Sequence, residues 1–416
     1  MMTRIIVFLI IVLLFEFLAF RGLLKLIKEK KRHKIVGLFY WGFTLVIVII
    51  LSAYYIYYQQ LDIPDYVRFR HFFKILSLFI LNFGPKICLS LFSILDDIFV
   101  FVIFVFNWIM KRNPKKMSLN RTRQVILCSG LLLALLLFVN IIYGMVWGKS
   151  DIEIKRITIS SEKLHQSFDG FKIAQISDIH LGSFKDKLLV EKTIALLIAE
   201  KPDIILFTGD MINNEAIETQ PFVPLFQALK PPCGMFSILG NHDMGDYRRW
   251  YRDGDKSCNL KDLIKAQQEM GFEMLRNRHT YLVSGNDSIA LIGVDNWGVP
   301  PFKKYGDLKM ALKGVNPNLF EILLSHDPSH WSNEVTGKTN IDLTLSGHTH
   351  GGQFVINFGN YKFSPVQWKY KQWSGLYKFN NQYLYVNTGL GYIGFSGRIG
   401  VPPEITMITL KAKPKE

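Results

Sequence analysis

The sequence predicts an all-α transmembrane region of about four helices over residues 1–150, followed by an α/β domain over residues 151–416. Long apolar runs, separated by short basic loops, fill the first part. After Lys149 the pattern changes to short β-rich runs that alternate with helical ones. His, Asp or Asn residues follow several of these β-rich runs, which places candidate functional residues in the second part.

The charge distribution supports this division of the chain. The 416 residues are 49% hydrophobic and carry a formal net charge of +15. Residues 1–150 hold 19 Lys and Arg against 6 Asp and Glu, whereas the remainder holds 30 against 28. The basic excess therefore lies between apolar runs, as in the cytoplasmic loops of a membrane protein. A nucleic-acid binder would instead need a basic face on its folded domain, so we expect no nucleic-acid binding.

Four apolar segments predict the membrane spans, at about residues 5–24, 35–57, 87–110 and 124–147. The apolar stretch 72–110 is too long for one span. We place a break at Asn82-Phe83-Gly84-Pro85, because proline removes a helix donor and restricts the residue before it. Residues 66–82 are then expected to form a separate helix at the membrane surface.

The basic loops predict how the chain crosses the membrane. Residues 25–34 and 111–123 are richest in Lys and Arg, so both are expected in the cytoplasm. Four spans then place the α/β domain on the extracytoplasmic side of an inner or plasma membrane. Asp96 and Asp97 lie inside the third span, and intramembrane carboxylates are costly. We interpret them as paired with basic or polar groups of neighbouring helices; a transport or proton-relay role is the alternative.

Alternating patterns predict the elements of the α/β domain. We expect helices at residues 186–200 and 215–229, where apolar residues recur at helical spacing. The four cysteines include no Cys-x-x-Cys pair, so no disulfide framework is expected, and whether Cys233 and Cys258 pair stays open. Strands are expected at 171–177, 204–208, 235–239, 289–294, 320–325, 341–345, 383–387 and 405–410.

Metal-ligand residue types follow five of these predicted strands. Because ligands gather at the carboxyl ends of strands in α/β sheets, we expect the side chains to converge on one site. Asp-x-His and Gly-Asp are weak evidence alone, since Gly-Asp is a common turn. Gly-Asn-His-Asp is sharper, and Gly-His-Thr-His is sharper again, because a His-x-His pair after a strand is rarely structural. Together and in this order they indicate a metal site. The segments are Asp178-Ile179-His180, Gly209-Asp210, Gly240-Asn241-His242-Asp243, Ser325-His326-Asp327 and Gly347-His348-Thr349-His350.

The chemistry of these residues indicates two divalent metal ions. Imidazole suits zinc, iron or manganese, whereas carboxylate and amide oxygens suit harder ions. The mixture of His, Asp and Asn therefore fits manganese, iron or zinc better than calcium or magnesium alone. Two ions about 3.5–4 Å apart can polarise a phosphoryl group and activate water for attack on it.

In this order the motifs resemble the calcineurin-like metallophosphoesterases, over about residues 170–410. The run from Gly347 to Gln353 resembles a bacterial membrane-associated branch of that family. The resemblance implies a four-layer sandwich of two mixed β-sheets flanked by helices. It also implies hydrolysis of phosphodiester or pyrophosphate bonds in a phosphorylated substrate, lipid-linked or nucleotide-linked, such as a lipid A precursor.

The resemblance further implies a role for each motif residue. Asp210 would bridge the two ions. His242 would orient the phosphate and protonate the leaving oxygen, and Asp243 would orient the His242 ring. The first ion would be held by Asp178, His180 and His350, and the second by Asn241, His326 and His348.

Other residues are candidates for contact with the substrate or the membrane. Arg398 either binds a phosphate, as arginine does bidentately, or lies in a surface loop. Asn213 either contacts the substrate or caps a helix. The aromatic-rich loop 361–377 lies on the membrane surface, holds an acyl chain, or is simply a packed loop.

We therefore expect a membrane-anchored, metal-dependent phosphoesterase. The alternative is a membrane sensor or transporter with a regulatory metal-binding outer domain, which only Asp96 and Asp97 favour. A lipid-linked substrate fits a membrane anchor. A cytoplasmic nucleotide-linked lipid precursor, however, would not reach an outward-facing site, so either that substrate or the predicted orientation is wrong.

Overall fold

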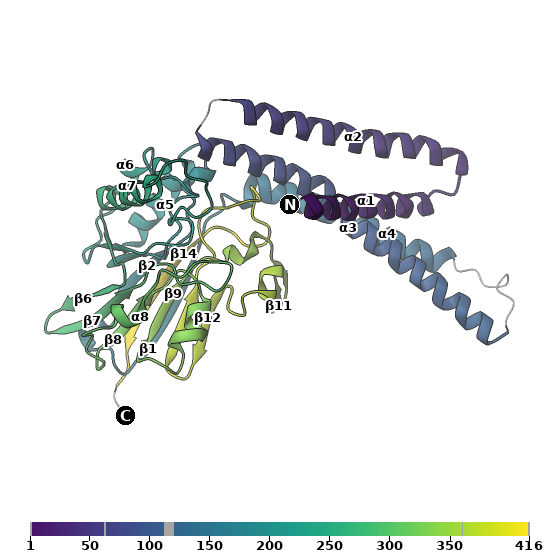
Figure 1. Cartoon of the computed structure of the whole chain (residues 1–416). Coiled ribbons are helices and arrows are strands. Elements are labelled where there is room, and N and C mark those ends of the chain that lie inside the picture. The colour runs from purple at the N-terminus through teal and green to yellow at the C-terminus, as the bar shows by residue number, and fades with distance from the viewer. Residues whose placement is uncertain (1, 62–63, 112–119, 360, 415–416) are drawn as a thin grey trace. The chain divides into compact units, whose positions relative to one another are not determined.

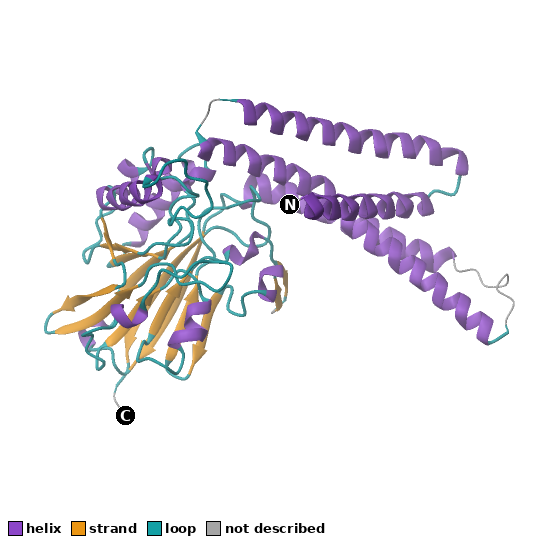
Figure 2. Cartoon of the chain, viewed as in Figure 1, coloured by secondary structure: helices purple, strands orange, loops and turns teal. Residues whose placement is uncertain are grey.

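A computed structural model describes residues 2–61, 64–111, 120–359 and 361–414 of the chain. The contacts divide the chain into two compact units (Figures 1 and 2). The first unit comprises Met1–Asp62 and His71–Tyr143, and the second comprises Ile63–Arg70 and Gly144–Glu416. The second unit thus includes a short early segment as well as the α/β domain.

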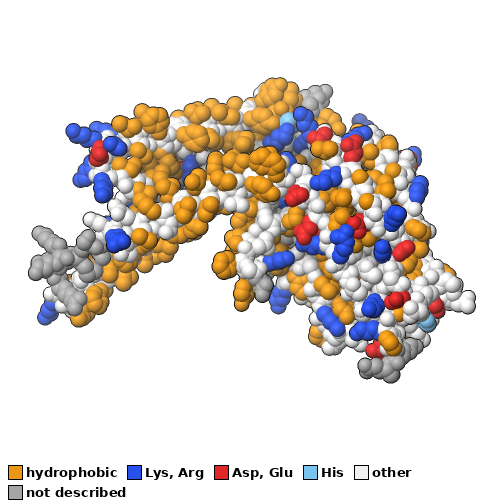
Figure 3. Space-filling model, turned by 180° about the vertical axis from the view of Figure 1, so that it is seen from behind, with side chains coloured by type: hydrophobic (Ala, Val, Ile, Leu, Met, Phe, Trp, Pro, Cys, Tyr) orange, Lys and Arg blue, Asp and Glu red, His pale blue; other side chains and the backbone are white. Residues whose placement is uncertain are grey.

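Long apolar helices make up the first unit. All four are long and apolar enough to cross a membrane, which confirms the predicted number of candidate spans. Exposed apolar side chains cover much of the face of these helices seen in Figure 3, as expected where lipid is the solvent. The helices are α1 (Met2–Leu26), α2 (Lys30–Gln60), α3 (Asp65–Ile109) and α4 (Asn120–Tyr143).

Helix α3 corrects one prediction. It continues through Pro85 for 45 residues, so the break expected at 82–85 is wrong and residues 66–82 are not a separate helix. Proline within a helix removes one backbone hydrogen bond. Ending the helix in an apolar environment would leave several backbone groups without hydrogen-bond partners, so a helix that continues through Pro85 loses fewer hydrogen bonds. We still predict that α3 crosses the membrane through residues 87–110.

The two intramembrane carboxylates are paired, as interpreted from the sequence. Asp96 is fully buried and accepts hydrogen bonds from the Arg123 guanidinium at 2.8 and 3.0 Å. The Lys25 ammonium lies 3.0 Å from Asp96 and 2.7 Å from Asp97, which also contacts Arg21 at 2.9 Å. These ion pairs account for both carboxylates, so the observation that favoured a transporter has a structural explanation.

Of the basic loop 111–123, residues 112–119 lie outside the described part of the chain.

Two six-stranded mixed sheets form the second unit. The first has the order β1 (Glu153–Ser161), β14 (Glu404–Ala412), β2 (Lys172–Ile176), β3 (Ile204–Phe207), β4 (Met235–Ser237) and β5 (Phe272–Met274). The second has the order β12 (Gly375–Phe379), β13 (Gln382–Val386), β9 (Leu343–Ser346), β8 (Phe320–Leu324), β7 (Asp287–Gly293) and β6 (Arg278–Ser284). The central strands β2, β3 and β4 run parallel, as do β7, β8, β9 and β13.

The cores between the layers confirm the expected four-layer sandwich. Apolar side chains from both sheets, such as Leu206 and Ile322, pack in the central core. The outer face of the first sheet packs against α5 (Leu188–Glu200), α6 (Val223–Phe226) and α7 (Asp255–Glu269). The outer face of the second sheet packs against α8 (Leu308–Ala311) and a π-helical turn at Trp331–Val335.

The predicted elements of this unit are largely confirmed. All eight predicted strands are present, with ends within two residues of those expected, and α5 matches the helix expected at 186–200. The helix expected at 215–229 is wrong, since only a 3₁₀ turn at Ala216–Thr219 and the short α6 form there. Pro221 and Pro224 interrupt that segment, and a residue before proline is disfavoured in a helix. Strands β1, β5, β6, β10 (Ile356–Phe358), β11 (Tyr361–Phe363) and β12 and helix α7 were not predicted.

A buried carboxylate links the two sheets. Glu404 on β14 is fully buried, and its Oε1 accepts a hydrogen bond of 2.7 Å from the Tyr385 hydroxyl on β13. Its Oε2 accepts one of 2.9 Å from Thr388 and lies 3.3 Å from the Lys155 ammonium. Burial, and then the Glu404 charge, raise the pKa of Tyr385 well above its usual value, so this hydroxyl remains a donor.

We predict that Tyr385→Phe lowers the free energy of unfolding by about 1–3 kcal/mol, because it removes a donor from a buried carboxylate. The measurement is the thermal midpoint of the full chain in detergent. A fall of about 2–4 °C is expected per kcal/mol. Tyr383→Phe on the same strand is the control, because Tyr383 is only half-buried. Equal midpoints for the two variants would show that the Tyr385 hydroxyl does not stabilise the fold.

Candidate metal centre

The predicted ligands lie on loops that follow strands of both sheets. Asp178 and His180 follow β2, and Asp210 follows β3. Asn241 lies in the loop after β4. In the second sheet, His326 follows β8, and His348 and His350 follow β9. Because parallel strands end at one edge of a sheet, these loops come together as the sequence predicted.

One group of side chains is formed by Asp178, His180 and His350. Each offers one ligand atom, and these atoms lie within 4.8 Å of one another. The Nε2 atoms of His180 and His350 are 3.1 Å apart, and His350 Nε2 lies 3.3 Å from Asp178 Oδ1. Three ligand atoms at such spacing can hold one metal ion.

A second group is formed by Asp210, His326 and His348, whose ligand atoms also lie within 4.8 Å of one another. His326 Nε2 lies 3.1 Å from Asp210 Oδ2 and 3.3 Å from His348 Nδ1. The same Asp210 oxygen is 3.7 Å from His180 Nε2, in the first group. Asp210 therefore lies between the two groups, where a bridging carboxylate is needed.

Asn241 tests whether these residues fit a metal ion. Its Nδ2 donates to the Tyr247 hydroxyl at 2.9 Å, whereas its buried Oδ1 has no hydrogen-bond partner among the described residues. A buried acceptor without a partner is unfavourable, and a cation is one group that can satisfy it. The amide oxygen, carboxylates and imidazoles together form a donor set that fits manganese, iron or zinc.

The backbone of the ligand loops is strained. Five of the ten non-glycine residues with positive φ in the described chain are candidate ligands. Such conformations are unfavourable and gather at functional sites, where the surroundings enforce them. Gly240 allows the close approach of two loops, because a Cβ there would lie 2.2 Å from Asp210 Oδ1. The five are Asp178 (φ 50°), His180 (51°), Asp210 (61°), His348 (70°) and His350 (51°).

The two carboxylates of the site attract positive charge. Burial raises the pKa of Asp178 to about 6. Burial also acts to raise the pKa of Asp210, but the neighbouring histidines, His326 first, hold it well below its usual value. For His326, burial favours the neutral ring, yet Asp210 and Asp178 raise its pKa to about 10. Burial lowers the pKa of His180 to about 3, which leaves this ring unprotonated and suited to bind a metal.

His242 and Asp243 lie at the site, but the structure corrects how they are connected. The His242 Nδ1 donates to the Asn213 carbonyl at 2.8 Å, so this carbonyl, rather than Asp243, orients the ring. The Asp243 carboxylate points back into the loop after β3, and burial raises its pKa to about 7. It accepts hydrogen bonds from the backbone amides of Asp210, Met211, Ile212 and Gly240. Asp243 therefore positions the loop of Asp210, and these hydrogen bonds of its carboxylate go to backbone amides rather than to the His242 ring.

Asn213 acts through its backbone and not as a side-chain ligand for substrate. Its side chain is buried (1% exposed) and bonds to the Ser183 hydroxyl at 3.1 Å. The backbone amide of Asn213 donates to the carboxylate of Glu218, which was not among the predicted site residues. Glu218 also accepts from the amides of Gly182, Asn214 and Glu215, so it joins the loops after β2 and β3. The signal in the sequence was the spacing of Glu215 and Glu218, which form a capping box.

Arg398 is neither a surface residue nor placed for a phosphate. It is 1% exposed, and it donates hydrogen bonds of 2.8 Å to the carbonyls of Thr388 and Gly391. A guanidinium nitrogen also lies 3.3 Å from His350 Nδ1. Both alternatives considered for Arg398 are therefore corrected, because the loop containing Thr388 and Gly391 encloses the guanidinium and takes up its donors. Burial lowers the pKa of Arg398 to about 10.

Two tyrosines at the site were not predicted as functional residues. The Tyr370 hydroxyl lies 2.7 Å from His348 Nε2. The Tyr247 ring lies 4.4 Å from the His242 ring, and its hydroxyl accepts from Asn241. Tyr370 is 22 residues from His348, and Tyr247 follows Asn241 by six residues, outside the Gly-Asn-His-Asp segment, so neither tyrosine belongs to the motifs used to predict the site.

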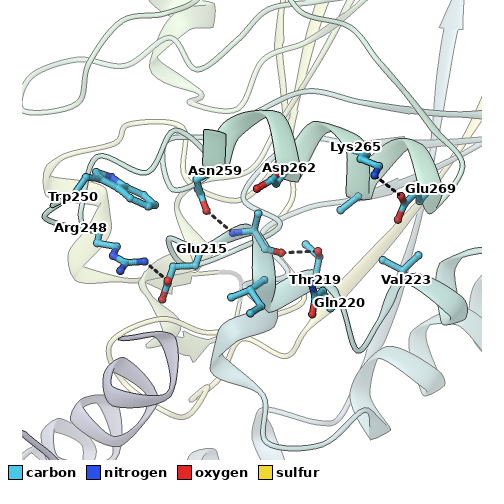
Figure 4. A pocket seen from close by; sticks show the side chains of 13 residues that line it. Glu215, Thr219, Gln220, Val223, Arg248, Trp250, Asn259, Asp262, Lys265 and Glu269 are labelled. Carbon is cyan, nitrogen blue, oxygen red and sulfur yellow. Dashed lines mark hydrogen bonds and ion pairs between the residues drawn. The ribbon is translucent and has the colours of Figure 1, made fainter. Parts of the chain in front are cut away.

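A cavity of about 520 Å³ lies beside Glu215 and Arg248 (Figure 4). Its lining includes none of the candidate ligands. The charges that line it are largely paired with each other, Arg248 with Glu215 and Lys265 with Glu269. We therefore treat this cavity as separate from the metal centre.

Comparison with known proteins agrees with this geometry. Residues 2–149 match the family described as "Probable Calcineurin-like phosphoesterase, transmembrane domain", and residues 171–352 match "Calcineurin-like phosphoesterase". The chain is 36% identical to the uncharacterized metallophosphoesterase YkuE of Bacillus subtilis, over 63% of this chain and 86% of that protein. It is 30% identical to the phosphodiesterase YaeI of Escherichia coli, over 58% of this chain and 82% of that protein.

The similarity also extends into the helical part. A transmembrane protein with a metallophosphoesterase domain from Danio rerio is 28% identical, over 78% of this chain and 72% of that protein. The family match over residues 2–149 and the four apolar helices together identify an integral membrane protein. The chain therefore belongs to the calcineurin-like metallophosphoesterases, as a member with a four-helix transmembrane domain.

Proposed function

We propose that this protein is a two-metal phosphoesterase that hydrolyses phosphodiester or pyrophosphate bonds. The observation that carries the proposal is the pair of ligand groups with Asp210 between them. The name of the relative YaeI, a phosphodiesterase, supports the choice of a diester. Two divalent ions, when bound, would polarise the phosphoryl group and supply a nucleophile from water.

The proposed ligand roles follow the geometry. Asp178, His180 and His350 would hold the first ion, and Asp210 would bridge to the second. Asn241, His326 and His348 complete the second set, to which Asn241 contributes its unpartnered Oδ1. Manganese, iron or zinc suits these donors.

His242 is the proposed proton donor to the leaving oxygen. Its Nδ1 is bound to the Asn213 carbonyl, so Nε2 is the nitrogen available to a substrate. Burial lowers the pKa of His242, but a bound phosphate would favour the protonated ring through its negative charge. The ring packs 4.4 Å from Tyr247, which restricts its orientation.

We further propose that the catalytic domain lies outside the cytoplasm. The positive-inside rule supports this side, since the basic loops 25–34 and 111–123 both follow odd-numbered spans. An outward-facing site would act on phosphorylated molecules of the extracytoplasmic membrane surface rather than on cytoplasmic lipid A precursors.

We predict that Asp210→Asn lowers turnover of a chromogenic phosphodiester by at least about 100-fold, because the amide cannot bridge two cations as a carboxylate does. The assay uses the full chain in detergent, with manganese, zinc or magnesium added after chelation. Bound metal, measured by mass spectrometry, should fall in parallel. Asp262→Asn, at an exposed position, is the matched control. Unchanged turnover in the Asp210 variant would refute the assignment.

For His242→Gln we predict a fall in kcat of about 10²–10⁴-fold, with metal content retained, because a general acid is lost. The loss should be smaller for a nitrophenyl leaving group than for an alkyl one, since nitrophenolate departs without a proton. His165→Gln, at an exposed ring, serves as the control. An equal loss for both leaving groups would contradict proton donation by His242.

The orientation predicts that a membrane-impermeant maleimide labels Cys258 in intact spheroplasts, because Cys258 is exposed on α7 of the catalytic domain. The Cys258→Ser variant should lose that label. Labelling that requires permeabilised cells would place the domain in the cytoplasm instead.

A further inference from the structure

The short strands β10 (Ile356–Phe358) and β11 (Tyr361–Phe363) form a two-stranded ribbon apart from the two main sheets (Figure 1). Ile356 is paired with Phe363, and Phe358 with Tyr361. Side chains on a strand alternate between faces, so these four lie on one face of the ribbon. The Trp368 ring packs edge-on against Phe363 at 5.9 Å. We call Ile356, Phe358, Tyr361, Phe363 and Trp368 the aromatic face.

The aromatic face is unusually exposed. Phe358, Tyr361 and Trp368 are 82%, 81% and 78% exposed, and Ile356 is 50% exposed. Clustered exposed aromatic side chains mark a surface that is covered by a partner. A two-stranded ribbon is at best marginally stable by itself, so a partner would also stabilise this one. Within the loop 361–377, the packed-loop interpretation therefore holds for Tyr370 and Trp373, which are buried with Val355 and Val401, but not for the aromatic face.

The surrounding charge indicates an anionic partner. Residues 343–403 contain no Asp or Glu and five Lys or Arg. Lys369 and Lys371 lie just beyond Trp368 and are exposed, whereas the exposed Lys362 pairs with Asn357 and so lies on the ribbon's other face. Tryptophan and tyrosine favour the membrane–water interface, and lysine favours anionic headgroups. This combination fits the surface of an anionic bilayer better than a soluble protein with an apolar patch.

The ribbon is attached to the metal centre. The Ser364 hydroxyl, just after β11, donates to the Gly351 carbonyl at 2.8 Å, next to His350. Tyr370 lies between Lys369 and Lys371 in the sequence, and its hydroxyl is 2.7 Å from His348 Nε2. On the ribbon's other face, Asn357 donates to the Gly400 carbonyl at 3.0 Å. A surface bound to the aromatic face would therefore lie close to the candidate ligands.

We propose that the aromatic face docks on the headgroup layer of an anionic bilayer. It follows that the metal centre acts on phosphoesters presented at the bilayer surface; this second statement rests on the proposed function, whereas the docking does not. The proposed binding partner of the aromatic face is lipid, and a protein partner is the alternative that the experiment distinguishes.

The docking is tested with the full chain in nanodiscs that contain phosphatidylglycerol. The exposed Cys128 and Cys258 are replaced by serine, and the environment-sensitive dye NBD is attached in Phe358→Cys. We expect a blue-shifted emission that doxyl-labelled lipids quench. The matched control is Val283→Cys on the β6–β7 hairpin, which is 66% exposed and should not be quenched. Absence of lipid quenching at position 358 overturns the proposal, whether the dye is in water or against protein.

The consequence for the substrate is tested by activity in proteoliposomes. The triple variant Phe358→Ser, Tyr361→Ser, Trp368→Ser should raise KM for a lipid-anchored nitrophenyl phosphodiester by at least about tenfold, because apolar area that binds the bilayer is lost. Its kcat on a soluble nitrophenyl diester should not change. Tyr281→Ser with Val283→Ser on β6 is the control, with no expected effect on either substrate.

The outcomes separate the two proposals. Equal loss on both diesters, or no loss on the lipid-anchored one, overturns the role of the aromatic face in presenting substrate. No turnover of either diester by the unaltered, metal-loaded chain overturns the proposed function, while the lipid quenching still decides the docking. We also expect Lys371→Gln, which removes an exposed lysine next to the aromatic face, to weaken binding to phosphatidylglycerol by about fivefold.

Discussion

Two buried carboxylates, Asp178 and Asp210, impose the main constraint on the catalytic domain. They are 0% and 1% exposed, and buried charges destabilise a fold unless cationic partners accompany them. His326 supplies part of this charge: burial opposes its protonation, but the two carboxylates raise its pKa to about 10. The two sheets pack so that the ends of β2, β3, β8 and β9 meet, and the ligand loops adopt left-handed backbone conformations to bring the side chains together.

Buried polar residues behind the site maintain that arrangement. Asp243 and Glu218 accept hydrogen bonds from backbone amides of the loops after β2 and β3. Arg398 donates to carbonyls of the loop after β13. Each is an ionisable side chain near the site, yet each bonds to the backbone rather than reaching into the site. The loops carry many unpaired backbone groups because they lack regular structure, and these side chains satisfy them.

Membrane association has two separate structural sources in this protein. The four apolar helices have the length and composition to cross a bilayer. The aromatic face is a second apolar surface, on the catalytic unit itself, with Phe358 and Trp368 largely exposed. An anchor alone confines the enzyme to the membrane but does not orient its site. A docking surface attached to the loop of His348 and His350 would add that orientation, which is the reason for proposing it.

The sequence by itself determined the apolar helices, all the metal-ligand residue types and most strands, because hydrophobic period, run length and residue chemistry are local properties. Only the tertiary structure decided that Asn213 orients His242, that Arg398 is buried and that Tyr370 reaches His348. It also decided that α3 continues through Pro85. Each of these depends on contacts between residues distant in sequence, or on an apolar environment in which breaking a helix is less favourable than keeping it. A one-dimensional pattern contains neither kind of information.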